Sequence, residues 1–84
     1  MYFVYILKSE KDESYYVGQT SNLDDRLKRH NEGRSVYTRS KRPWKLVYVE
    51  RFYTRKEAIK REKEIKTKKR KSYIEYLIAC KEIK

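Results

Sequence analysis

The chain opens with an almost unbroken run of apolar and β-forming residues from Tyr2 to Lys8. Such a run predicts a strand that is covered on both faces, as in the centre of a sheet. A polar turn over residues 9–14 separates it from a second apolar segment, residues 15–20, so we expect an antiparallel hairpin. Gly18 lies inside the second strand, where a glycine predicts a bulge or the close approach of another group.

A helix is predicted to follow the hairpin. Ser21 or Asn22 can cap its start, and Gly33 is placed to end it. The arc that faces the sheet holds two leucines and the histidine, with an arginine at its margin: Leu23, Leu27, His30 and Arg26. A lone histidine beside leucines is more often a core residue than a catalyst, and an arginine at a rim is more often a snorkelling side chain. The helix alone therefore favours structural roles for both.

The second half of the chain predicts one more strand and two more helices. Residues 46–52 alternate well enough for a third strand, and Trp44 before them is expected to anchor a loop to the core. Both helices should start at a capping box, Thr54 with Glu57 and Ser72 with Glu75. The last helix has a broad apolar face that includes Cys80, which we interpret as a core residue and not as a nucleophile.

Glu62 interrupts the apolar arc of the second helix, which is otherwise formed by Ala58, Ile59 and Ile65. Burying a carboxylate without a partner is costly, so Glu62 must meet a cation, a hydrogen-bonding network or a metal ion. An ion pair with Arg26 or with a lysine explains the position as well as a metal ion does.

The length and the composition set the class of protein. The 84 residues leave room for one modest core, so we expect a single domain over residues 1–84. With one cysteine and one histidine, the chain has no internal disulfide and no ligand set for a structural zinc, and any metal must be bound by oxygen. There is no signal-peptide pattern and no apolar run near the ~20 residues of a membrane span. We therefore expect a soluble, cytoplasmic protein without a membrane partner.

Positive charge exceeds negative charge by a wide margin, since 23 Lys and Arg against 12 Asp and Glu give +11. A lysine-rich composition or thermal adaptation would explain many lysines, but not this excess. Residues 34–44 combine four cations with two aromatic rings, and residues 66–71 hold five cations. Cations for phosphates beside rings for bases are typical of nucleic-acid-binding loops. The candidate binding residues are Arg34, Arg39, Lys41, Arg42, Lys66, Lys68, Lys69 and Arg70.

Two tyrosines of the hairpin, in Val4-Tyr5 and Tyr16-Val17-Gly18, lie eleven positions apart. They resemble the paired motif that names the GIY-YIG nuclease family, although the first motif here, Phe3-Val4-Tyr5, lacks the name-giving glycine and isoleucine. The resemblance continues through Asn22-Leu23-x-x-Arg26-Leu27-x-x-His30-Asn31, the loop from Thr38 to Trp44, and Ala58-x-x-Arg61-Glu62-x-x-Ile65-Lys66. The chain is also similar to the incision domain of bacterial nucleotide excision repair and to the catalytic domains of some homing endonucleases.

The resemblance implies an α+β fold, a small three-stranded antiparallel sheet flanked by about three helices. It also implies phosphodiester hydrolysis with one divalent ion, Mg²⁺ or Mn²⁺. Carried over by position, Tyr16 would deprotonate or orient the attacking water with help from Tyr5, and Arg26 would stabilise charge on the phosphoryl oxygens. Glu62 would hold the metal ion, and His30 would shuttle a proton or bind phosphate.

We therefore favour a metal-dependent endonuclease that hydrolyses DNA, is directed by structure more than by sequence, and acts in DNA repair or recombination. The alternative is a nucleic-acid-binding module, for DNA or RNA, that keeps the fold without efficient cleavage. In a third interpretation the protein is structural, Tyr5 and Tyr16 are core aromatics, and the charge serves solubility. Cleavage in the presence of a divalent ion separates the first hypothesis from the other two.

Overall fold

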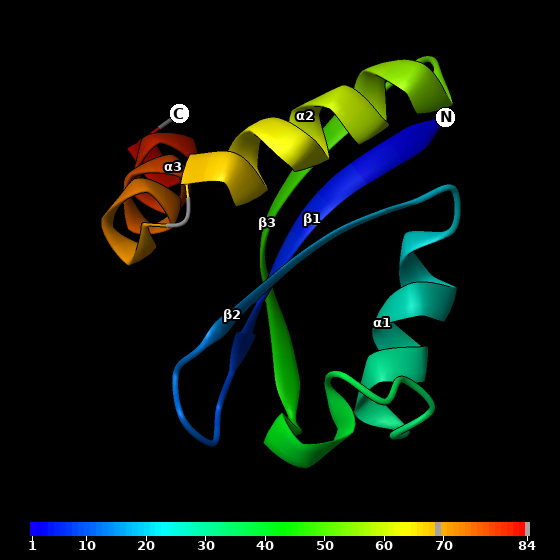
Figure 1. Ribbon diagram of the computed structural model, residues 1–84, viewed down its shortest axis with the longest axis vertical. Coiled ribbons are helices and arrows are strands. Elements are labelled where there is room, and N and C mark those ends of the chain that lie inside the picture. Colours follow the sequence, from blue (N-terminus) through cyan, green and yellow to red (C-terminus); the bar gives the residue numbers. More distant parts are fainter. Residues whose placement is uncertain (69, 84) are drawn as a thin grey trace.

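A three-stranded antiparallel sheet runs through the middle of the molecule (Figure 1). The computed structural model describes residues 1–68 and 70–83. Strand β1 (Tyr2–Ser9) lies between β2 (Tyr15–Thr20) and β3 (Trp44–Phe52) and pairs antiparallel with both. The predicted hairpin and the predicted three-stranded antiparallel sheet are therefore confirmed.

Helices cover both faces of the sheet. Helix α1 (Leu23–Asn31) lies on one side, and α2 (Arg55–Lys68) and α3 (Lys71–Ile83) lie on the other (Figure 1). The core on the α1 side is built on Tyr5, Leu7 and Trp44, and the opposite core on Val4, Ile6, Val17, Tyr48, Ala58, Ile65 and Leu77. Alternate residues of β1 thus enter different cores, which confirms the prediction of a central strand.

The ends of α1 form as its sequence predicts. The Asn22 side chain accepts a hydrogen bond from the backbone N–H of Asp25 at 3.1 Å, so Asn22 is the cap. At the other end Gly33 has a φ of 78°, a left-handed conformation that glycine adopts without steric cost. The N–H of Gly33 donates to the carbonyl of His30, and the next N–H donates to the carbonyl of Arg29, which closes a Schellman motif.

One of the two predicted capping boxes is present. The Thr54 hydroxyl accepts from the N–H of Glu57 at 3.2 Å, and the Glu57 carboxylate accepts from the N–H of Thr54 at 3.3 Å. The prediction that Ser72 caps α3 is wrong, because α3 begins at Lys71. The carbonyl of Arg70 already accepts helical hydrogen bonds from the first turn, so Ser72 lies inside the helix.

The loop between α1 and β3 is more ordered than its sequence suggests. It contains a short 3₁₀ helix, η1 (Arg39–Lys41). The Asn31 side-chain amide donates to the carbonyl of Trp44 at 3.0 Å and accepts from its N–H at 2.6 Å. Trp44 also pairs with Ser9 of β1, so β3 begins at Trp44, two residues before the predicted start. Trp44 is buried, as expected of a residue that anchors the loop to the core.

Within residues 1–68 and 70–83, no helix is long and apolar enough to cross a membrane.

Candidate active site

The two motif tyrosines meet above a glycine on the α1 face of the sheet. Tyr5 on β1 is paired with Gly18 on β2. A Cβ atom at position 18 would lie 2.5 Å from the Tyr5 hydroxyl oxygen and 3.1 Å from the Tyr16 ring. Glycine therefore leaves the room that the Tyr5 ring needs to cross the edge strand. This confirms that Gly18 marks the close approach of another group.

His30 joins the two tyrosines from α1. Its Nε2 lies 3.1 Å from the Tyr5 hydroxyl, and its Nδ1 lies 2.7 Å from the hydroxyl of Thr38. The Tyr16 ring centroid is 4.8 Å from that of His30, and the Tyr5 and Tyr16 centroids are 6.3 Å apart. Three proton-handling side chains from three different elements thus meet at one point.

Burial keeps two of these groups neutral. Burial, followed by the neighbouring Tyr16, raises the pKa of Tyr5 well above its usual value, although Arg26 opposes the rise. Burial, together with the cations Arg26 and Arg29, lowers the pKa of His30 below 6.5. At neutral pH Tyr5 and His30 are therefore an uncharged hydrogen-bonded pair. Tyr16 is half-buried, so solvent reaches it more readily than Tyr5.

Two neutral tautomers of His30 satisfy both of its contacts. In one, Nδ1–H donates to Thr38, and Nε2 accepts the hydroxyl proton of Tyr5. In the other, Thr38 donates to Nδ1, and Nε2–H donates to the oxygen of Tyr5. The choice decides whether the histidine can accept a proton from the tyrosine, so Thr38 influences the proton chemistry of the pair.

Arg26 brings a partly desolvated cation to the same place. Its Nε is buried and has no hydrogen-bond partner among the described residues. A buried donor without a partner is uncommon in proteins, because the lost hydrogen bond to water costs about 1–3 kcal/mol. The opposing effect of Arg26 on the pKa of Tyr5 places its charge near the tyrosine hydroxyl. The unmet donor suits an anionic oxygen.

Glu62 on α2 lies within electrostatic range of Tyr5. Burial and Tyr16 raise the pKa of Tyr5 most, and the negative charge of Glu62 adds to the rise. The Glu62 side chain is 19% exposed, and its carboxylate lies 3.0 Å from Lys66 Nζ, one helical turn away. The lysine ion pair considered from the sequence is therefore present. Within residues 1–68 and 70–83, no cluster of three or more His, Cys, Asp or Glu residues could hold a metal ion.

Thr38 is the residue of this site that the sequence did not single out as functional. It is 1% exposed, and its carbonyl accepts the indole N–H of Trp44 at 2.8 Å. A threonine in a basic, polar loop carries no periodic signal of burial. The one signal for it in the sequence was its position at the start of the loop from Thr38 to Trp44, which is part of the resemblance to the family.

The predicted nucleic-acid-binding residues form two separate groups. Arg34 and Lys41 are already in surface ion pairs, with Glu32 at 3.1 Å and with Asp12 at 3.4 Å. Asp12 also lines a hollow with Lys66 and Arg70, so the acidic turn after β1 lies between the two basic segments. Arg39, Arg42, Lys68 and Arg70 are exposed, and Lys69 lies outside the described residues. Exposed ion pairs are weak, so phosphates can compete for the paired cations.

The comparison with protein families defines the class of this protein. The model of the GIY-YIG catalytic domain matches residues 1–75. The chain therefore belongs to the GIY-YIG family, as its tyrosine motifs indicated. GIY-YIG nucleases are endonucleases that generally use divalent metal ions and bind DNA.

Small proteins of the UPF0213 group are similar to this chain over most of their length. A UPF0213 protein of Clostridium perfringens is 49% identical, over 100% of this chain and 89% of its own. UPF0213 protein YazA of Bacillus subtilis is 41% identical, over 88% of this chain and 78% of its own. The solution NMR structure of a UPF0213 protein from Bacillus halodurans superposes with a TM-score of 0.61 at 36% identity, covering 96% of this chain and 86% of that one.

Proposed function

We propose that the protein is a metal-dependent endonuclease that hydrolyses DNA phosphodiester bonds, is directed by structure more than by sequence, and acts in DNA repair or recombination. One observation carries the proposal, the meeting of Tyr5, Tyr16 and His30 beside the unmet buried donor of Arg26. In-line hydrolysis of a phosphodiester needs a positioned water and positive charge near the developing phosphorane. This corner of the sheet brings groups for both needs together.

Tyr16 would orient the attacking water. A free tyrosine, with a reference pKa of about 10, is protonated at neutral pH, so it can take a proton from the water only where a nearby cation favours its phenolate. Its ring lies against His30, which is neutral and hydrogen-bonded to Tyr5. Tyr5 is buried, so its role would be to hold His30 through their hydrogen bond. Tyr16 is half-buried, so it would be the tyrosine that contacts the attacking water.

Arg26 would bind a phosphoryl oxygen through its half-buried guanidinium, which would have to turn its Nε toward the anion. That donor gives up no existing hydrogen bond among the described residues when an anion arrives. A preorganised donor in a partly desolvated site stabilises charge that develops in the transition state more than a flexible surface cation does.

Glu62 would hold the divalent ion, Mg²⁺ or Mn²⁺. Its side chain is largely buried and its charge is felt at Tyr5. Mg²⁺ usually keeps several waters and takes one or two carboxylates together with substrate phosphates, so a donor set with one carboxylate fits. When bound, such an ion supplies a Lewis acid for the phosphoryl and leaving oxygens. The carboxylate would then exchange its Lys66 partner for the ion.

Cleavage of a panel of DNA substrates tests the proposal. Duplex, single-stranded, flapped and four-way-junction DNA are incubated with Mg²⁺, with Mn²⁺ and with EDTA. We expect cleavage that EDTA and Glu62→Gln both abolish, because EDTA removes the metal ion and the substitution removes its carboxylate ligand. Tyr16→Phe keeps the ring and removes the hydroxyl, so turnover should fall about 10²- to 10⁴-fold with little change in stability.

Lys66→Gln is the matched control for Glu62. It removes the same ion pair but leaves the carboxylate in place. If Glu62 binds the metal, Lys66→Gln should change the DNA concentration needed for half-maximal rate more than the saturated rate. Equal loss of the saturated rate in both variants would mean that the ion pair, and not metal binding, explains Glu62.

The second candidate is a nucleic-acid-binding module, for DNA or RNA, without efficient cleavage. The ion pair of Glu62 with Lys66 favours it, because this pair occupies the carboxylate that a metal ion would need. Salt-dependent binding of the same panel with no product in either metal would establish this function and reject the endonuclease.

A further inference from the structure

Two apolar side chains project from the loop that follows α1. Val36 is 72% exposed and Tyr37 is 87% exposed. The carbonyl of Ser35 accepts the N–H groups of Thr38 at 3.3 Å and Arg39 at 3.0 Å, so Val36 and Tyr37 occupy the middle of a tight turn. A single exposed tyrosine is ordinary on a protein surface. Its attachment and its charged surroundings therefore decide whether it has a role.

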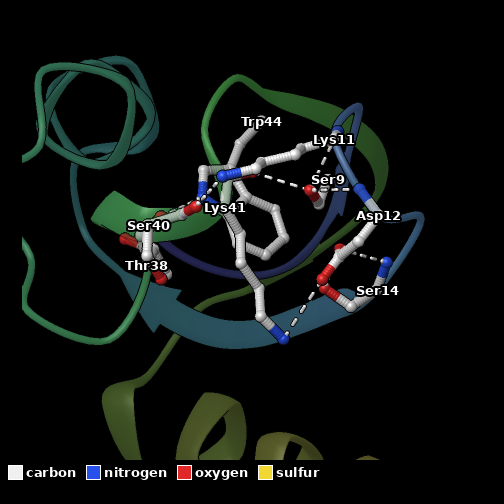
Figure 2. A network of polar contacts seen from close by, with 8 residues as sticks. All are labelled: Ser9, Lys11, Asp12, Ser14, Thr38, Ser40, Lys41 and Trp44. Carbon is white, nitrogen blue, oxygen red and sulfur yellow. Dashed lines mark hydrogen bonds and ion pairs between the residues drawn. The ribbon is translucent and has the colours of Figure 1, made fainter.

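The turn is held rigidly on the body of the protein. Thr38, directly after Tyr37, is buried between His30 and the Trp44 indole. Figure 2 shows how η1 is tied to the end of β1 and to the turn after it. Ser9 Oγ donates to the Lys41 carbonyl at 2.6 Å, and Lys11 Nζ donates to the Ser40 carbonyl at 3.2 Å. The backbone under Tyr37 is therefore preorganised, which lowers the entropy lost when its ring binds something.

The loop that carries the turn is basic, although two of its cations are in surface ion pairs, Arg34 with Glu32 and Lys41 with Asp12. Residues 33–43 contain four cations and no acidic residue. The Arg42 guanidinium lies over the backbone at Gly33, where an added Cβ would be 2.6 Å from Nη1, and its Nε donates to the carbonyl of Arg39 at 2.9 Å. A polyanion complements this loop, and an apolar or basic protein surface does not. The ligand chemistry that combines many negative charges with flat aromatic faces is nucleic acid.

We propose that Tyr37 stacks on an unpaired base of the bound nucleic acid, beside the site around His30. In a duplex the base faces are covered by neighbouring base pairs, so a ring at the surface finds a free face at an unpaired or unstacked base. Thr38, the next residue in the chain, is hydrogen-bonded to His30, so the Tyr37 backbone is one residue away from the site. The inference rests on the proposed function for its ligand. It names the substrate class as nucleic acid with unpaired bases next to the cleaved bond.

Binding measured without cleavage tests the base subsite. Fluorescent DNA of one sequence is offered in EDTA as a single strand and as a blunt duplex, to the parent protein and to Tyr37→Ala. Stacking on aromatic side chains is lost on alanine substitution, so the single strand should bind about 5- to 150-fold more weakly. The duplex should bind about equally to both proteins, and Tyr37→Phe should keep the parental affinity for the single strand.

Two controls isolate stacking from charge and from folding. Tyr53→Ala removes an equally exposed ring, 85% exposed, beyond the opposite end of β3, and should leave the single-strand affinity unchanged. The salt dependence of Tyr37→Ala should equal that of the parent, because no phosphate contact is lost. An abasic scan completes the design, since removing the stacked base should weaken the parent but not Tyr37→Ala.

Equal single-strand affinity of Tyr37→Ala and the parent would overturn the inference, as would an equal loss on duplex and single strand. The two proposals fail in distinguishable ways. If the endonuclease proposal fails, the Tyr37 effect on binding persists and no substrate is cut. If the base subsite fails, Tyr37→Ala behaves like the parent in binding while the parent still cleaves.

Discussion

His30 is both a core residue and a candidate catalyst, which the sequence presented as alternatives. It is 2% exposed, as expected for a histidine beside leucines, yet both ring nitrogens meet hydroxyl groups. Because both ring nitrogens are hydrogen-bonded, burying the neutral imidazole leaves no polar atom without a partner and costs little free energy. Protonation would break one of these contacts or require a hydroxyl to reorient. The residue therefore links the stability of the fold to pH.

We expect the protein to lose stability as the pH falls through about 6.5. Burial, with Arg26 and Arg29, lowers the pKa of His30 in the folded state, so the unfolded chain binds the proton at a higher pH. Stability is complete above the unfolded pKa and declines between it and the folded pKa. Urea unfolding of the parent and of His30→Gln from about pH 7.5 to 5.5, above the range in which carboxylates titrate, measures the difference. Parallel pH profiles of the two proteins would contradict this linkage.

At the scale of elements, the pattern of apolar positions predicted most of the fold. The unbroken run of β1 predicted a central strand, because such a strand must be apolar on both faces. The Asn22 cap and the Gly33 end of α1 follow from local backbone chemistry, which the sequence carries directly. Of the candidate site, the sequence supplied Tyr5 and Tyr16 through their motif, and Arg26, His30 and Glu62 through the wider family resemblance.

Features that depend on contacts between distant residues were not predictable in this way. Strand β3 begins at Trp44 because this residue pairs with Ser9 of β1, and the Asn31 side chain, thirteen residues before it, binds the same backbone. Thr38 is buried because His30 and Trp44 both bind it, and no local pattern records either contact. Ser72 has the local signature of a cap, but the helix starts one residue earlier.

A substitution in β2 tests whether the Tyr5 ring needs the space above Gly18. Gly18→Ala should destabilise the protein by about 1–3 kcal/mol, because the new methyl group would overlap the buried Tyr5 hydroxyl. Displacing that hydroxyl should also break its contact with His30 and lower cleavage. Urea unfolding and cleavage rates measure the two effects.

Gln19→Ala is the control for the same strand. Gln19 follows Gly18 and points to the other face, so its replacement should cost less than about 1 kcal/mol and leave cleavage near the parental rate. If Gly18→Ala were as stable and as active as Gln19→Ala, neither the stability of the fold nor cleavage would depend on the present position of the Tyr5 hydroxyl.

At the scale of the whole molecule, the excess charge is not spread evenly. The +11 net charge includes two basic segments with the acidic turn after β1 between them. Asp12 in that turn pairs with Lys41, whereas Arg39 makes no ion pair among the described residues. A polyanion must therefore compete with Asp12 for Lys41, whereas it meets no such competitor at Arg39. This difference makes the electrostatic part of binding testable residue by residue.

Affinity for DNA should fall linearly with salt on logarithmic axes, because each neutralised phosphate releases counterions. Arg39→Gln should reduce the magnitude of that slope by about 0.9 for one lost contact to a duplex, and Lys41→Gln by less, since Lys41 already has a partner.

Asp12→Asn should raise the affinity at low salt, because it frees Lys41 and removes a repulsive charge. Titrations of a labelled duplex at several salt concentrations in EDTA measure all three. An affinity that stays flat between low and moderate salt would mean that phosphates do not dominate binding, and both nucleic-acid proposals would then fail.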